Sequence, residues 1–186
     1  MNQQQRSQLL ESQLRAFTEG SIENINEQWV FFDDETEEAL LLDDYIHQEI
    51  EVYRHNRWKK GLLLKEGKIQ TGASLIDLTN NDPVRIRKQL VYSLERLLEE
   101  LNEDAFLHFI TTLNSLQFSI YDCIYCYNHL TFLAQSEGKS GVNFIMFDNQ
   151  EEIANVQHHF DYFDQQNDRF EFTLSSGRRT LIERIS

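Results

Sequence analysis

The feature that most constrains the fold is the stretch of residues 82–134, which contains no glycine and begins next to the only proline of the chain. Its apolar residues recur at spacings of three and four, the period of a helix with one buried face. Asp82 can accept hydrogen bonds from first-turn N–H groups, and Pro83 at the first helical position loses no hydrogen bond. The stretch therefore predicts a central three-helix block.

Each expected helix has its own buried residues. The first is expected to bury an aliphatic stripe formed by Ile86, Leu90, Leu94, Leu97 and Leu101. Asn102 is a suitable cap for the second, which would bury Phe106, Phe109, Ile110 and Leu113. The third is apolar nearly all round between Phe118 and Leu133, which predicts burial on more than one side. We therefore expect Ile124→Asp to unfold the protein.

Residues on both sides of this block show strand patterns. After a short helix over residues 3–17, five apolar runs separated by turn residues predict an antiparallel β meander or SH3-like barrel, with strands at 21–26, 28–33, 38–42, 46–54 and 57–65. Residues 142–147, a strand from about 155, the alternating run 170–174 and a terminal hairpin over 178–185 predict a C-terminal β meander. The predicted fold class is α+β, with residues 1–78 as one part and 79–186 as a second part packed on it.

Composition predicts a folded intracellular protein. The chain has 186 residues, 40% of them apolar, which is enough to form a core without disulfides. Its two cysteines lie three residues apart and the N-terminus lacks an apolar signal-peptide core, so we expect a cytoplasmic setting. The most apolar window, residues 115–134, includes Gln117, Asp122 and Asn128, and their cost in hydrocarbon argues against a membrane span.

The net charge of −14 is concentrated in the N-terminal part. No lysine or arginine occurs between Arg15 and Arg54, whereas twelve acidic residues do. Such a field repels nucleic-acid phosphates and anionic lipid and attracts basic partners. The charge distribution argues against direct nucleic-acid binding through this region.

The acidic interval leads to the primary functional hypothesis, a non-enzymatic interaction or regulatory protein that presents an acidic surface to a basic protein partner. Aromatic anchors would come from Trp29 and Phe31, and the candidate carboxylates are Asp33, Asp34, Glu35, Glu37, Glu38, Asp43 and Asp44. A sharper form has these carboxylates imitate DNA phosphates. The run lacks the spacing and central glycine of an EF-hand loop, so a solvated turn is the simpler alternative to a cation site.

The sharpest local pattern is Cys123-x-x-Cys126-x-x-His129. Thiolates and imidazole are ligands that zinc prefers, but on a helix the three side chains would spread over roughly 120° with no second cysteine pair. We therefore expect buried core residues here and predict no metal and no cofactor. The histidines at 158 and 159 would point to opposite faces of a strand.

Two alternative functions remain open. A metal-dependent or hydrolytic enzyme would form its site between the helices and the C-terminal strands, from His108, His129, His158 and Asp161. A nucleic-acid binder would instead use the basic and aromatic cluster of Arg54, Arg57, Trp58, Lys59 and Lys60. The simpler reading of that cluster is a hairpin that balances the neighbouring acidic strands, with Trp58 partly buried.

Overall fold

The computed structural model describes residues 3–133 and 138–185. The described chain is mostly β, with one antiparallel sheet of eight strands, another of five, and three α-helices. The predicted α+β fold with a central three-helix block is therefore wrong. Residues Phe17–Lys88 form one compact unit, here called the β unit, and the residues up to Ala16 and from Gln89 onward form another, the helix–sheet unit. No helix of the described residues is long and apolar enough to cross a membrane.

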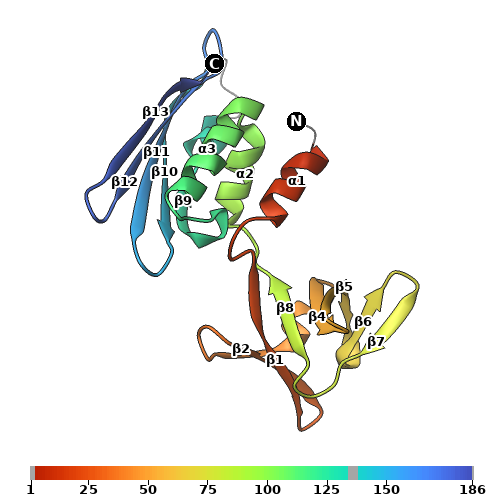
Figure 1. The fold of residues 1–186 in the computed structure, drawn as a ribbon. Helices are drawn as coiled ribbons and strands as arrows, with labels where there is room; N and C mark the ends of the chain where they lie inside the picture. Colours follow the sequence, from red (N-terminus) through yellow and green to blue (C-terminus); the bar gives the residue numbers. More distant parts are fainter. Residues whose placement is uncertain (1–2, 134–137, 186) are drawn as a thin grey trace. The chain divides into compact units, whose positions relative to one another are not determined.

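The β unit contains the eight-stranded sheet, in the order β3-β2-β1-β8-β4-β5-β6-β7. Its strands are β1 (Phe17–Ile25), β2 (Gln28–Asp33), β3 (Ala39–Leu41), β4 (Glu49–Arg54), β5 (Arg57–Leu64), β6 (Lys68–Thr71), β7 (Ser74–Asp77) and β8 (Pro83–Arg87), with short 3-10 turns η1 (Leu42–Tyr45) and η2 (Lys65–Gly67) (Figure 1). The five strands predicted before residue 65 are present, with shifted ends, but the predicted meander or SH3-like barrel is wrong, because β8 lies between β1 and β4 in one sheet of eight strands. Their core comprises Ile22, Phe31, Leu42, Ile50, Val52, Leu63, Ile69, Leu78, Val84 and Ile86.

Strand β8 corrects the predicted first helix. Val84 and Ile86 are buried opposite Val52 and Ile50 of β4, so the segment alternates with the period of a strand. Proline is tolerated as the first residue of a strand. Asp82 does not cap a helix; its carboxylate pairs with Arg54 and accepts the Thr79 N–H at 2.7 Å. The boundary proposed between residues 78 and 79 lies inside the β unit.

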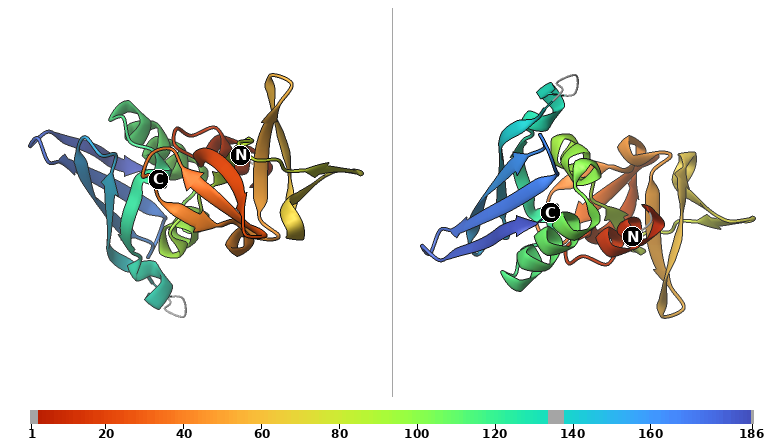
Figure 2. Two further views of the ribbon diagram at one scale, coloured as in Figure 1. Left: turned by 90° about the horizontal axis from the view of Figure 1, so that it is seen from below. Right: turned by 90° about the horizontal axis from the view of Figure 1, so that it is seen from above.

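The helix–sheet unit consists of two helices packed on a five-stranded antiparallel sheet, with order β13-β12-β11-β10-β9, and an N-terminal helix. The elements are α1 (Gln3–Glu11), α2 (Tyr92–Glu100), α3 (Glu103–Ser115), η3 (Ile120–Asp122), β9 (Cys123–Tyr127), η4 (His129–Leu133), β10 (Ser140–Asp148), β11 (Ile153–Asp161), β12 (Asn167–Leu174) and β13 (Arg179–Ile185). Helices α2 and α3 lie against one face of the sheet (Figures 1 and 2). The second predicted helix, capped by Asn102, is confirmed, and so are the C-terminal strands.

The third predicted helix is absent; its sequence forms strand β9, flanked by the short 3-10 turns η3 and η4. Cys126 pairs with Ile145 and Tyr127 with Phe144 of β10. Aromatic and β-branched residues fit a pleated surface, and a partner strand is available here, which favours the extended conformation. Ile124 is 57% exposed, so the burial on which the expected effect of Ile124→Asp rested is wrong.

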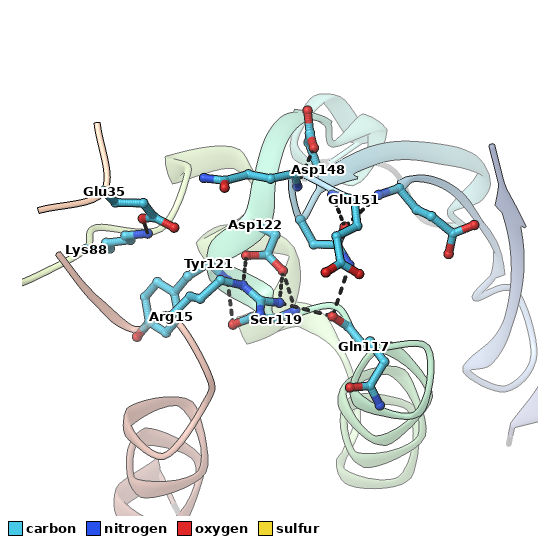
Figure 3. Close-up of polar contacts among 12 residues, drawn as sticks. Arg15, Glu35, Lys88, Gln117, Ser119, Tyr121, Asp122, Asp148 and Glu151 are labelled. Carbon is cyan, nitrogen blue, oxygen red and sulfur yellow. Dashed lines mark hydrogen bonds and ion pairs between the residues drawn. The ribbon is translucent and has the colours of Figure 1, made fainter. Parts of the chain in front are cut away.

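The N-terminal segment is tied to the rest of the helix–sheet unit by two arginines. Arg15 donates to Asp122 through Nε at 2.7 Å and Nη2 at 2.5 Å, and the Asp122 carboxylate also accepts the Ser119 N–H at 2.7 Å (Figure 3). Arg6 donates to the carbonyls of Leu98 and Leu101 at the end of α2. A cation at a helix C-terminus also interacts favourably with the helix dipole. Arg6 thus holds α1 beside the end of α2, and Arg15 holds the segment after α1 beside η3.

Candidate functional site

The predicted partner-binding acids lie on the β2–β3 turn and on η1, a surface here called the acidic corner (Asp33, Asp34, Glu35, Glu37, Glu38, Asp43, Asp44). The turn is built by Asp33, whose carboxylate accepts the N–H groups of Glu35 at 2.7 Å and Thr36 at 3.2 Å. Glu37 adopts a left-handed backbone conformation with φ of 58°. Leu42, which is 2% exposed, anchors η1 in the core. The fold thus places acidic side chains at the tip of a turn and on the first turn of η1.

Tyr45 shows that the two acidic segments share one neighbourhood. Partial burial raises the pKa of its hydroxyl, and the negative charges of Asp44 and then Asp33 raise it further. Strand β2, which ends at Asp33, contacts η1, which carries Asp43 and Asp44. The tertiary fold therefore joins acids that lie about ten residues apart in the sequence.

Internal ion pairs divide the acidic residues of the β unit into two groups. Glu51 is 8% exposed and pairs with Arg85 at 2.6 Å, and Glu49 pairs with Lys60 at 2.7 Å and with Arg87 at 3.3 Å. In the acidic corner, Lys88 lies 4.0 Å from Glu35 (Figure 3). Within residues 3–133 and 138–185 no ion pair involves Asp34, Glu37, Glu38, Asp43 or Asp44. The acidic corner keeps most of its charge.

Neither aromatic anchor expected from the sequence is fully exposed. Phe31 is 0% exposed and belongs to the core of the β unit, so its predicted role as a surface anchor is wrong. Trp29 is half-buried, and a Cβ built on Gly67 would lie 2.3 Å from its indole Nε1. Gly67 therefore leaves room for Trp29 to pack beside the backbone. The structure gives both residues packing roles.

The basic and aromatic cluster lies on the β4–β5 hairpin, as expected, with Trp58 partly buried. His55 and Asn56 form its turn with φ of 57° and 59°, the left-handed values of a tight hairpin. Trp58 stacks on Arg85, whose guanidinium lies 4.5 Å from the ring centre and which also pairs with Glu51. Arg54 is held by Asp82. These internal contacts occupy groups that a nucleic-acid site would require.

The arginines of β8 were missed by reasoning from sequence. A helix over these residues would place Arg85 and Arg87 on its polar face, whereas in the structure they neutralise Glu51 and Glu49 on the neighbouring strand. The alternation Val84, Arg85, Ile86, Arg87 was the available signal, because it fits a strand with one buried face.

A buried polar network crosses the five-stranded sheet of the helix–sheet unit. Asn143 accepts the His129 N–H at 2.6 Å, and its amide nitrogen lies 3.0 Å from His158 Nδ1. His158 Nε2 lies 2.7 Å from Asp168 Oδ1, which also accepts the Tyr162 hydroxyl at 2.6 Å. Since the His129 N–H orients the Asn143 amide, His158 Nδ1 accepts a hydrogen bond and Nε2 donates one.

The surroundings of this network favour a structural role over a catalytic one. Asn143 and His158 are 0% exposed and Asp168 is 1% exposed, so substrate has no access to the pair. The His158 ring stacks on Phe170 with 4.4 Å between ring centres. Burial raises the pKa of Tyr162, and the Asp168 charge raises it further, so the phenol stays protonated. The pair has the geometry of a base and its orienting acid, but the groups bonded to it are an amide and a phenol rather than a nucleophile.

The residues of the enzymatic alternative do not converge. His129 joins the network through its backbone N–H, and His158 through its ring. His108 is exposed on α3, and Asp161 is exposed at the end of β11. His158 faces the core and His159 lies on the opposite face, which confirms the expected alternation. Asn143, Asp168 and Tyr162 were missed because isolated polar residues in strands carry no local signal of burial.

The two cysteines are buried or half-buried in β9. Burial raises the pKa of Cys123 to about 12 and that of Cys126 to about 11, so both remain thiols at neutral pH. No group of three or more metal-ligating side chains occurs in the described part of the chain. The cysteines and His129 therefore pack as part of the fold.

Comparison with known proteins identifies a family. A family model described as "Protein of unknown function (DUF2777)" matches residues 4–184. The uncharacterized protein YisN of Bacillus subtilis (strain 168) is 30% identical over 178 residues, which cover 95% of this chain and 90% of that protein. No solved structure matches the chain. The similarity thus extends over both units.

Proposed function

The chain belongs to the DUF2777 family of proteins of unknown function, and we propose that it acts as a non-enzymatic interaction protein whose acidic corner binds a basic surface of another protein. The observation that carries the proposal is the division of charge within the β unit. Glu49 and Glu51 are neutralised by cations of the same sheet, whereas Asp34, Glu37 and Glu38 are exposed and keep their charge. Exposed charges steer association and select partners of opposite sign.

The local fold supports this function because it presents the carboxylates on defined backbone. The Asp33 carboxylate fixes the β2–β3 turn, and Leu42 fixes η1 in the core. Preorganised charges lose less conformational entropy on binding than charges on a disordered tail. Lysine and arginine side chains of a partner would pair with several carboxylates at once.

Charge reversal tests the proposal. The variant Asp34→Lys/Glu37→Lys/Glu38→Lys leaves Asp33 in place, so the turn keeps its hydrogen bonds. The control Glu95→Lys/Glu100→Lys/Asp164→Lys makes the same change in net charge at exposed positions of the helix–sheet unit. Proteins captured from lysate by the wild type, the variant and the control are compared at low and high salt. We expect the wild type and the control to retain basic proteins at low salt. The variant with the charge-reversed acidic corner should lose them.

The result has a clear contrary outcome. Capture that ignores both salt and the substitutions in the acidic corner would exclude the proposed function. Duplex DNA added as a competitor tests the sharper form, in which the carboxylates occupy a site for phosphates: a partner of that kind is displaced by DNA.

A further inference from the structure

The five-stranded sheet has an outer face that α2 and α3 do not cover. These helices pack on the opposite face, where Ile145 and Cys126 are buried (Figure 1). Because side chains alternate along a strand, the neighbours of these residues point outward. Phe144 pairs with Tyr127, and Met146 pairs with Tyr125, on this outer face. The four side chains form a continuous apolar surface over β9 and β10.

This surface is unusually exposed for large apolar residues. Tyr125 is 51% exposed, Phe144 42% and Tyr127 40%, and Phe132, which is 72% exposed, stacks on Tyr127 with 6.0 Å between ring centres. Tyr125, Tyr127, Phe132, Phe144 and Met146 are here called the aromatic strip. Contiguous exposed apolar residues of this kind mark interaction sites.

The strip is restricted to one edge of the outer face. Following the register from Phe144 across the sheet, the next residues are Gln157 on β11 and Glu171 on β12, and then Leu181 on β13. The polar residues separate the aromatic strip from Leu181, which is 49% exposed. Leu181 is therefore a matched exposed apolar residue outside the strip.

Carboxylates lie at both ends of the β10–β11 hairpin that carries the strip. Asp148 lies four residues after Phe144 on β10, and Asp161 lies four residues after Gln157, the β11 partner of Phe144. Since every second side chain of a strand points to the same face, both aspartates share the outer face with Phe144. No lysine or arginine occurs between Lys139 and Arg169. Eight residue steps along β10 separate the two ends, which is about 27 Å. The strip thus has a carboxylate near each end; Lys139 adjoins the Asp161 end, and Arg169, which lies across from His159, is paired with Glu171.

We propose that the aromatic strip binds an amphipathic segment of a partner protein that has an apolar centre and cationic residues at both ends. Its apolar side chains cover Phe144 and Tyr127, and its lysines or arginines pair with Asp148 and Asp161. Aromatic residues provide large contact areas at low cost in side-chain entropy. This surface lies in the helix–sheet unit and is independent of the acidic corner.

The same charges argue against other occupants. Exposed aromatics on a sheet can stack nucleic-acid bases, but carboxylates at both ends would repel the phosphates. A second copy of the chain, related by a two-fold axis, would place acidic ends against acidic ends. A cationic amphipathic segment is the occupant that complements both the apolar centre and the ends.

The test uses an 18-residue fluorescent peptide with a leucine-rich central part and lysines at both ends, because 18 helical residues span about 27 Å. Its binding to the full chain is followed by anisotropy. We expect Tyr127→Thr/Phe144→Thr to raise Kd by about tenfold or more. Asp148→Asn/Asp161→Asn should raise Kd as well, with the largest effect at low salt, and asparagine can still accept the local N–H bonds of Asp148 and Asp161.

Three controls make the result specific. Leu181→Thr removes an exposed apolar side chain from the same face and should leave Kd unchanged. A peptide with glutamates in place of the lysines should not bind. The charge-reversed acidic corner should bind the lysine peptide normally, which separates this inference from the proposed function. Circular dichroism of each variant verifies that it is folded.

Several outcomes would overturn the inference. These are failure of the wild type to bind the lysine peptide, equal binding by wild type and Tyr127→Thr/Phe144→Thr, or equal binding of the glutamate peptide. Single-stranded RNA that binds while the peptide does not would assign the strip to nucleic acid. A concentration-dependent dimer that is lost in Phe144→Thr, without peptide binding, would assign it to a second copy.

Discussion

At the scale of the residue, neighbours in the sequence differ sharply in environment. His158 is 0% exposed and bonded to Asp168, whereas the adjacent His159 lies on the other face, with 29% of its side chain exposed. His158→Ala should remove the bond from Nε2 and leave the buried Asp168 with Tyr162 as its bonded partner. We expect a loss of about 3 kcal/mol in the free energy of unfolding.

Urea unfolding at neutral pH, followed by circular dichroism, measures this loss. His159→Ala is the matched control and should cost less than about 1 kcal/mol, because its ring is partly solvated. Equal destabilisation by the two substitutions would contradict the structural role of the buried network.

The cysteines give a prediction that depends on pH. Burial raises the pKa of Cys126 to about 11 and that of Cys123 to about 12, from an ordinary 9.0. The folded state therefore favours the thiols, and this stability is complete below pH 9 and is lost as the pH rises toward 11 and 12. The free energy of unfolding should fall over that range.

The variant Cys123→Ala/Cys126→Ala should show a smaller decrease with pH, measured by urea unfolding at a series of pH values. A thiol-specific reagent at pH 8 should react slowly with the folded protein and rapidly with the unfolded one. Rapid reaction of the folded protein would show that the thiols are accessible and ionisable.

At the scale of the element, β8 and β9 show where local pattern fails. Ile86, Leu90 and Leu94 have helical spacing, yet a helix begins only at Tyr92 because Val84 and Ile86 complete the sheet beside β4. In β9, pairing with β10 outweighs the apolar pattern that suggested a helix. The secondary structure of a short segment depends on which partner strand is available to it. The 13-residue α3, in contrast, has its capping residue and its apolar face within its own sequence.

The altered assignment of β9 reverses one mutational expectation. Ile124 is 57% exposed, so Ile124→Asp should cost less than about 1 kcal/mol. Ile145, on the adjacent strand, is 0% exposed, and Ile145→Asp should unfold the helix–sheet unit because it buries a charge without a partner. Thermal melts of the two variants measure the difference. Unfolding by Ile124→Asp would restore the buried-helix interpretation.

At the scale of the whole molecule, the two units have separate hydrophobic cores. Both tryptophans, Trp29 and Trp58, belong to the β unit, so tryptophan fluorescence reports on that unit. The α-helices belong to the helix–sheet unit and dominate the far-ultraviolet circular dichroism. The two signals therefore follow the two cores separately.

Val156→Ala and Val52→Ala test this independence. Each removes buried methyl groups from one core and should cost that unit about 2 kcal/mol. In denaturant titrations, Val156→Ala should lower the midpoint seen by circular dichroism, and Val52→Ala the midpoint seen by fluorescence. Equal shifts of both midpoints by either substitution would show that the units unfold as one.

The sequence by itself determined the elements whose signals are local. The β4–β5 hairpin follows from left-handed turn residues, α3 follows from its Asn102 cap, and β12 follows from strict alternation. The interval without cations was also visible in the sequence and led to the acidic corner. Pairing between segments distant in the chain was decided by the tertiary structure: it made β8 and β9 strands, set Arg85 against Glu51, and joined His158 to Asp168. The physical reason is that strand formation, charge neutralisation and burial of polar groups depend on which surfaces meet, and local spacing carries no information about that.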